Sequence, residues 1–289
     1  MKYLLTIIGL AISLAASAQN VDSLLDEILF EDESLIDLLK AESKKKYQFL
    51  YFNTGYDGQS TFAGRDLGLD QFSITSQALY FNSSGFNARV YGVWYSQFNP
   101  KYNLTGLSLG YSIYPDKKKK WRLRAAYDRY FFADSESSNI SNSLSFSSTY
   151  KLNKQIRTSV NSSFLIGNEV IPQFSWSTYG SFKLYKKSYL KYISFDPGIS
   201  VFFSSESLVT QYEQFNRRTR SFTTYEEEEK SFGAMNTRIS LPISVNLNNW
   251  DFELGYNYML PSSPLGGTSS ESLSNTGFIS FSIGYLLDL

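Results

Sequence analysis

The chain has 289 residues, in which 27 Lys and Arg are balanced by 27 Asp and Glu. This balance gives no electrostatic indication of nucleic-acid binding. The sequence contains neither Cys nor His, which excludes disulfides and thiolate metal sites and removes the commonest general base. We therefore expect no metal and no cofactor. The aromatic content of 17% fits either a soluble β protein or a transmembrane β-barrel.

Residues 1–18 have the pattern of a cleavable signal peptide. The positively charged start Met1-Lys2 precedes an apolar run from Leu4 to Leu14, and Ala16-Ser17-Ala18 is a cleavage site of small residues. The apolar run is too short to span a membrane, and no later segment is long and apolar enough to do so as a helix. We predict an exported chain that begins at Gln19.

Residues 19–46 differ in composition from everything that follows. The segment is acidic and ends in a basic run, and apolar residues recur at helical spacing from Leu24 to Leu39. Asp22 and Ser34 are suitable N-caps. We predict a periplasmic extension with one or two short amphipathic helices. Three roles remain open for it: a plug for the domain that follows, a docking segment for a periplasmic or membrane partner, or a flexible spacer.

From residue 47 onward, apolar and polar residues alternate with a period of two. The clearest apolar faces lie in residues 139–152 and 233–247, where they consist of Ile140, Leu144, Phe146, Tyr150, Met235, Ile239, Leu241, Ile243 and Val245. Such alternation predicts strands with one apolar and one polar face. The strands we expect span residues 47–56, 70–82, 86–98, 103–114, 120–132, 139–152, 155–167, 173–185, 189–204, 233–247, 250–260 and 274–289.

The length of these strands and of their connections predicts a membrane barrel. Most strands run about 13 residues, whereas strands of soluble proteins have a mode near 5–6. A tilted strand of that length rises roughly 33 Å, enough for a bilayer core of about 30 Å. Connections at 57–69, 133–138, 168–172, 205–232 and 261–273, several of them long, alternate with connections that are all short, at 83–85, 115–119, 152–154, 186–188 and 248–249. We predict an all-β antiparallel transmembrane barrel of about twelve strands over residues 47–289, with its short turns in the periplasm.

The final segment, "TGFISFSIGYLLDL", alternates up to its last residue. Its apolar row from Ile279 to Leu289 should face lipid, while Ser280, Ser282 and Gly284 face the lumen. The segment resembles the C-terminal signal read by the barrel-assembly machinery, although it ends in Leu289 where Phe or Trp is frequent. With its acidic "DSLL" start, the whole chain resembles an outer-membrane barrel of the Bacteroidetes type. This resemblance implies an outer-membrane location, contact with lipid and lipopolysaccharide, and assembly by that machinery.

Strand parity also predicts which charged side chains line the lumen. Six are basic and three are acidic: Arg89, Arg122, Arg124, Arg157, Lys183 and Arg238, with Asp128, Asp251 and Glu253. Because an isolated buried charge is costly, these groups either pair and plug the barrel or line a hydrated channel with a mild anion preference. Large inward residues should narrow that channel, namely Tyr91, Tyr95, Tyr130, Tyr179 and Tyr185.

The sequence gives less support to catalysis or to cation binding. The Ser–His and Asp–His mechanisms of outer-membrane phospholipases and proteases fail without His. Asp251 and Glu253 lie two residues apart on a strand, and three interpretations of them remain open: an acid/base pair, a cation site, or charges that simply line the lumen. The acidic run at 226–229 is a cation-binding loop that bridges lipopolysaccharide, or a solvated loop. We predict that the chain is no enzyme. It is a narrow passive channel for small solutes, or alternatively a non-conducting structural or accessory barrel of an envelope complex.

Overall fold

The computed structural model describes residues 48–59, 61–62, 65–66, 71–98, 100–133, 140–188, 191–216, 221–263 and 274–289, and the side chains of these residues except 61–66 and 206–229. The predicted signal peptide and the predicted extension at 19–46 lie outside the described residues. Within them, no helix is long and apolar enough to cross a membrane. The described chain is built of strands and their connections.

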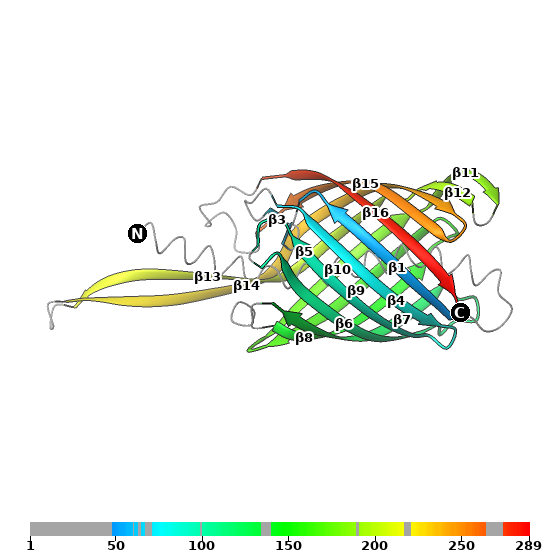
Figure 1. Ribbon diagram of the computed structural model, residues 1–289. Coiled ribbons are helices and arrows are strands. Elements are labelled where there is room, and N and C mark those ends of the chain that lie inside the picture. Colours follow the sequence, from blue (N-terminus) through cyan, green and yellow to red (C-terminus); the bar gives the residue numbers. More distant parts are fainter. Residues whose placement is uncertain are drawn as a thin grey trace.

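The strands form a closed antiparallel barrel (Figure 1). Neighbours along the chain pair in sequence from β1 to β16, and β16 then pairs with β1 to close a ring of twelve strands. The ring strands are β1 (Gln48–Asp57), β4 (Ser73–Asn82), β5 (Phe86–Tyr95), β6 (Tyr102–Ile113), β7 (Trp121–Phe132), β8 (Ile140–Lys151), β9 (Ile156–Gly167), β10 (Val170–Gly180), β13 (Gly198–Asn216), β14 (Ser221–Leu247), β15 (Trp250–Pro261) and β16 (Thr276–Asp288). The predicted fold class is confirmed.

Two of the predicted strands are interrupted, which extends the barrel at its short-turn end. β11 (Phe182–Ser188) continues β10 past the rim, and β12 (Lys191–Phe195) returns antiparallel to β11 and leads into β13. β11 pairs with β12, and β12 pairs with the end of β14. Because β9 begins at Ile156, which pairs with Gly180, the hairpin of β11 and β12 reaches past β9.

The long-loop end differs from the prediction at two places. Residues 205–232 were expected to form the longest loop, but β13 and β14 stay paired from Gly198 and Ser240 to Asn216 and Ser221. The result is a two-stranded ribbon that projects far beyond the rim (Figure 1). A small hairpin of β2 (Thr61–Phe62) and β3 (Arg65–Asp66) lies within the expected loop 57–69. The pairing can continue past the membrane because the hydrogen bonds of an antiparallel ladder run between the two strands themselves.

The outer face of the barrel is apolar. On β6, Leu107, Leu109, Tyr111 and Ile113 are exposed, and the residues between them are buried or half-buried. Exposed aromatic side chains gather near both rims: Trp121, Tyr150 and Trp250 at the short-turn end, and Tyr56, Tyr102 and Phe131 at the long-loop end. An apolar band between two aromatic girdles is characteristic of outer-membrane-type barrels.

Specific residues stabilise two of the short turns. Gly85 has a φ of 100°, and a Cβ there would overlap the carbonyl oxygen of Ser112. In the turn between β6 and β7, the Asp116 carboxylate accepts hydrogen bonds from the backbone N–H of Lys120 at 2.9 Å and of Trp121 at 2.8 Å. These bonds stabilise the charged form and lower the pKa of Asp116. The turn is therefore fixed by one ionised side chain.

Three side chains lie on faces opposite to those expected, because register shifts exchange the two faces. A shift between Ile140 and Asn142 turns Ile140 inward, where it is 5% exposed. A shift opposite Phe202 and Phe203 likewise buries Met235. In β11, a shift after Lys183 leaves Tyr185 58% exposed, so that Tyr185 does not narrow the lumen as predicted.

The two faces of β16 provide a test of the assignment of inside and outside. Phe281 faces outward near the middle of the strand, and its neighbour Ser282 faces the lumen. Phe281→Arg should lower the free energy of unfolding by about 2–4 kcal/mol, the cost of a cation near the midplane. Ser282→Arg should cost clearly less. Urea unfolding in lipid vesicles would measure both variants, and equal losses would contradict the assignment.

Candidate functional site

The inner face of the ring carries the charged side chains that parity predicted. Strand register and burial place eight of the nine inside the ring, the ninth being Lys183 on β11, which extends past the rim. Their distribution around the ring is uneven. Arg89, Arg122, Arg124 and Arg157 lie on β5, β7 and β9, whereas Asp251 and Glu253 lie on β15. The lumen therefore has a mainly basic wall and a mainly acidic wall.

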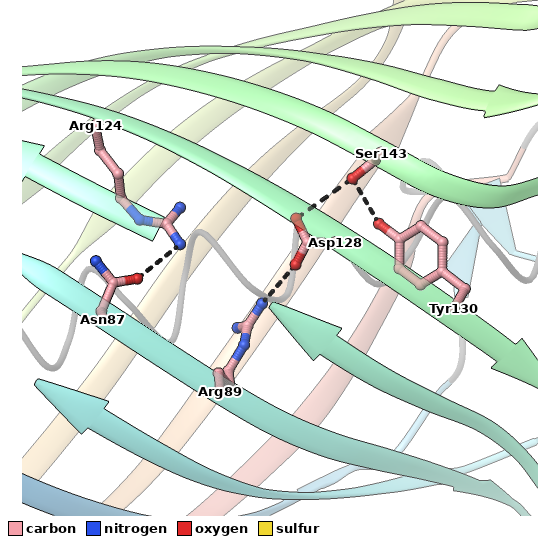
Figure 2. Close-up of polar contacts among 6 residues, drawn as sticks. All are labelled: Asn87, Arg89, Arg124, Asp128, Tyr130 and Ser143. Carbon is pink, nitrogen blue, oxygen red and sulfur yellow. Dashed lines mark hydrogen bonds and ion pairs between the residues drawn. The ribbon is translucent and has the colours of Figure 1, made fainter. Parts of the chain in front are cut away.

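On the basic wall, a buried ion pair joins two strands that are not neighbours (Figure 2). The Nη2 atom of Arg89 on β5 lies 3.6 Å from Oδ1 of Asp128 on β7, and both side chains are at most 3% exposed. Ser108 of β6 is in register with both residues and is small enough to let them meet. Ser143 completes the group by donating to Oδ2 of Asp128 at 3.4 Å.

Arg124 occupies the same wall nearer to the short turns. Its Nη2 donates to Oδ1 of Asn87 at 3.3 Å across β6 (Figure 2). Gly110 of β6 lies between them, and a Cβ there would be 2.5 Å from Oδ1 of Asn87 and 3.1 Å from Nη2 of Arg124. The absence of a side chain at Gly110 thus provides the space in which the Arg124 contact forms.

The acidic wall contains a carboxylate that the sequence prediction missed. Asp196, between β12 and β13, accepts hydrogen bonds at Oδ2 from Ser194 at 2.6 Å and from Ser244 at 3.0 Å. The same Ser244 hydroxyl lies 3.1 Å from Oε2 of Glu253. On β15, Oδ2 of Asp251 accepts from the Tyr51 hydroxyl at 3.4 Å. Three carboxylates, one from the link between β12 and β13 and two from β15, thus share one wall.

A glycine also provides the space for a side-chain contact on the acidic wall. Tyr51 lies on β1, and β16 separates it from Asp251 on β15. Gly284 of β16 is in register with Asp251, and a Cβ there would overlap the Tyr51 hydroxyl. The ring of Tyr51 therefore crosses β16 above Gly284 to reach Asp251. An alanine at this position would push the tyrosine away from the carboxylate.

Apolar side chains fill part of the lumen. One cluster towards the long-loop end comes from β5 to β9 and comprises Tyr91, Val93, Tyr95, Leu104, Tyr130, Ile140 and Leu165. A second, of Phe49, Tyr51, Leu79 and Leu286, lies on β1, β4 and β16. Tyr91 packs over Gly106, where a Cβ would overlap its ring. Apolar contacts as well as charges therefore occupy the inner face of the ring.

The remaining charged residues of the inner face and its rim change the ratio of basic to acidic side chains. Arg238 on β14 lies 5.9 Å from the Phe202 ring, and Lys183 lies 4.6 Å from the ring of Tyr192. Asp57 ends β1 on the lumen side, where it is in register with Ser73 and Ser280. Parity could have found Asp57 had β1 been extended by one residue. The acidic residues of the inner face and its rim thus include Asp57 and Asp196 beside the predicted Asp128, Asp251 and Glu253.

The described part of the lumen bears on the metal site and the acid/base pair considered for Asp251 and Glu253. The described residues contain no group of three His, Cys, Asp or Glu side chains arranged to hold a metal ion. Asp251 and Glu253 share a strand face as predicted, but their hydrogen-bond partners are a tyrosine and a serine. The acidic run 226–229 has no described side chains, so its proposed role as a cation loop remains a prediction.

No protein-family profile and no curated protein matches the sequence. Solved barrels are similar at low levels. The NanC porin has 11% identity and a TM-score of 0.42, with coverage of 82% of this chain and 98% of the porin. An outer membrane channel from Pseudomonas putida has 6% identity and a TM-score of 0.42, with coverage of 84% of this chain and 95% of the channel. The translocator domain of the autotransporter NalP from Neisseria meningitidis has 12% identity and a TM-score of 0.40, with coverage of 91% of this chain and 97% of the translocator. Likeness this remote does not indicate what the chain does.

The ion pair between Arg89 and Asp128 can be tested by a double-mutant cycle. Asp128→Leu leaves a buried guanidinium without its carboxylate and should cost about 3–5 kcal/mol of unfolding free energy. Adding Arg89→Met to that variant should recover most of the loss, because both charges are then gone. Unfolding in vesicles measures each corner of the cycle. A double variant that loses the sum of the two single effects would show that the residues are not coupled.

Proposed function

We propose that the chain is an outer-membrane channel for passive diffusion of small hydrophilic solutes. The observation that carries this proposal is the contrast between an apolar exterior and an interior with charges of both signs. Several buried polar groups of the lumen wall, among them the side-chain amides of Gln71 and Gln77 and the hydroxyl of Thr75, find no hydrogen-bond partner among the described residues. Such groups are normally satisfied, and a hydrated lumen would satisfy them.

The location and orientation follow from the same features. Closed barrels with an apolar band belong to outer membranes, and the predicted signal peptide provides export. We infer that the long-loop end faces outward, which places both ends of the barrel domain in the periplasm. Lipid, lipopolysaccharide and the assembly machinery are the partners this proposal entails, and a further periplasmic or membrane partner at residues 19–46 stays open. The Bacteroidetes-type resemblance remains a prediction.

Ion selectivity should be weak. The predicted mild anion preference assumed six basic residues against three acidic ones. With Asp57 and Asp196 included, the acidic residues rise from three to five, and one of them, Asp128, is paired with Arg89. We therefore expect any anion preference to be small. The separation of charge between the two walls is a stronger feature than the net charge.

A second function is favoured by the apolar cluster around Tyr91. Seven buried side chains pack together inside β5 to β9, and packing of this density resembles a protein core more than a pore. In this alternative the barrel does not conduct and serves as a structural or accessory subunit of an envelope complex. The ribbon of β13 and β14 beyond the rim would then be a natural surface for contact.

Single-channel recording in planar bilayers separates the two functions. The purified protein should give discrete conductance steps with a reversal potential near zero in a salt gradient. Tyr91→Ala should raise the unit conductance, because the ring that covers Gly106 narrows the lumen. Leu109→Ala, on the outer face of β6, serves as a control that leaves conductance unchanged. Wild-type protein that inserts and never conducts would overturn the channel and support the structural alternative.

The orientation has its own test. An epitope tag inserted within residues 261–273, at the long-loop end, should be detected by antibody on intact cells. A tag within 115–119, at the opposite end, should be detected only after the outer membrane is permeabilised. Surface detection of the second tag alone would invert the proposed topology.

A further inference from the structure

One charged side chain lies on the outer, apolar face of the barrel. Among the described side chains of β4 to β9, Arg129 of β7 is the only charged one that points outward. Its neighbours in register are Leu107 of β6, which is 45% exposed, and Asn142 of β8. A cation on this face is costly unless it lies near a membrane surface and has a partner there. The partner of Arg129 must therefore be sought at the membrane surface.

The height of Arg129 on β7 corresponds to the membrane interface at the long-loop end. The strand ends at Phe132, three residues further on, which is about 10 Å along the strand. Phe131, the next outward residue, belongs to the aromatic girdle of that rim, and its ring centre lies 5.6 Å from Cζ of Arg129. Aromatic girdles mark the level of the lipid headgroups. Arg129 is therefore at the depth where headgroups meet acyl chains.

The guanidinium of Arg129 is oriented by its neighbours and remains accessible. Its Nη1 donates to Oδ1 of Asn142 at 2.9 Å, and the same oxygen accepts from the Tyr127 hydroxyl at 2.6 Å. Nδ2 of Asn142 donates to the Ser141 hydroxyl at 2.9 Å, which directs Oδ1 towards Arg129. A guanidinium has five N–H donors, and this contact uses one. Because Arg129 is exposed and forms no ion pair with a described residue, its other donors can meet an anion outside the barrel.

A second cation stands on the same side of the barrel, closer to the rim. Lys101 lies in the turn between β5 and β6, and its Nζ is 5.6 Å from the centre of the ring of Trp94, an outward residue of β5. Lys101 is exposed. Leu107, the β6 neighbour of Arg129, follows Lys101 by six residues, which is about 20 Å along the strand. A large headgroup with several anionic groups can contact cations at both heights, whereas the headgroup of one phospholipid is too small.

We propose that Arg129 binds a phosphate group of lipopolysaccharide on the outer face of β7, and that Lys101 contacts the same headgroup nearer to the rim. The planar guanidinium matches two phosphate oxygens at once, which makes phosphate the anion best suited to Arg129. This inference rests on the proposed orientation, in which the long-loop end faces outward. It goes beyond the proposed channel function, because it assigns a site to the lipid-facing surface and none to the lumen.

Native mass spectrometry of the purified protein in detergent tests the site. The wild type should retain lipid A that carries its phosphates, the membrane anchor of lipopolysaccharide, and should retain dephosphorylated lipid A with the same acyl chains far less. Arg129→Gln should weaken binding of the phosphorylated form roughly tenfold, the scale of losing a charge-assisted hydrogen bond. Arg129→Lys keeps the charge but loses the planar fork, and its affinity should lie between those two. Inorganic phosphate in excess should not displace the lipid.

A matched control removes one positive charge at the other end of the barrel. Lys119→Gln changes the turn between β6 and β7 and should bind lipid A as the wild type does. Heat-modifiable migration on gels checks that every variant is folded.

Three results would refute the inference. They are equal retention of the two forms of lipid A by the wild type, equal binding of the phosphorylated form by the wild type and Arg129→Gln, and displacement of the lipid by free phosphate. Binding in detergent depends neither on conduction nor on the orientation of the barrel in a membrane. A failure here is therefore distinguishable from a failed conductance or epitope-tag experiment.

Discussion

The pairing of the first barrel strand with the last is the interaction on which the rest of the structure depends. β1 and β16 are in register from Phe49 and Asp288 to Asp57 and Ser280. Without this ladder, both strands would present unpaired N–H and C=O groups to lipid, at a cost of several kcal/mol for each group. Closure also fixes which face of every strand is inside, because the side-chain period is two. The alternation of β16 up to the C-terminus follows from this requirement.

Once the ring is closed, the chain must place its charges inside or at the rims. The barrel accommodates them by two different means. Arg89 and Asp128 pair across a serine and are nearly inaccessible, which suits a rigid wall element. Asp196 and Asp251 are held instead by hydroxyl donors, from Ser194 and Ser244 to Asp196 and from Tyr51 to Asp251. Both arrangements lower the cost of placing a charge inside the barrel, since a buried charge without partners is expensive.

The sequence was sufficient to predict the barrel, because lipid outside and polar groups inside impose alternation over whole strands. It also indicated most of the charged lumen, since parity places Arg124 and Asp251 without any knowledge of their partners. It could not indicate that Arg89 meets Asp128, which depends on the stagger between β5 and β7. It also failed at Ile140 and Tyr185, because a register shift moves a single residue to the other face and leaves composition unchanged.

The position of the acidic wall has a cause in the backbone. Pro197 interrupts the strand that β12 and β13 would otherwise form, and Pro242 lies in the facing part of β14. Neither proline has an N–H to donate, so a ladder broken here loses fewer bonds than elsewhere. The backbone N–H of Asp196 donates to the Pro242 carbonyl at 3.0 Å, and the backbone N–H of Gly180 donates to the Pro197 carbonyl at 2.7 Å. Gly180 is in register with the first residue of β9, so this break lies level with the rim of β9. The acidic wall therefore stands at the short-turn mouth of the barrel.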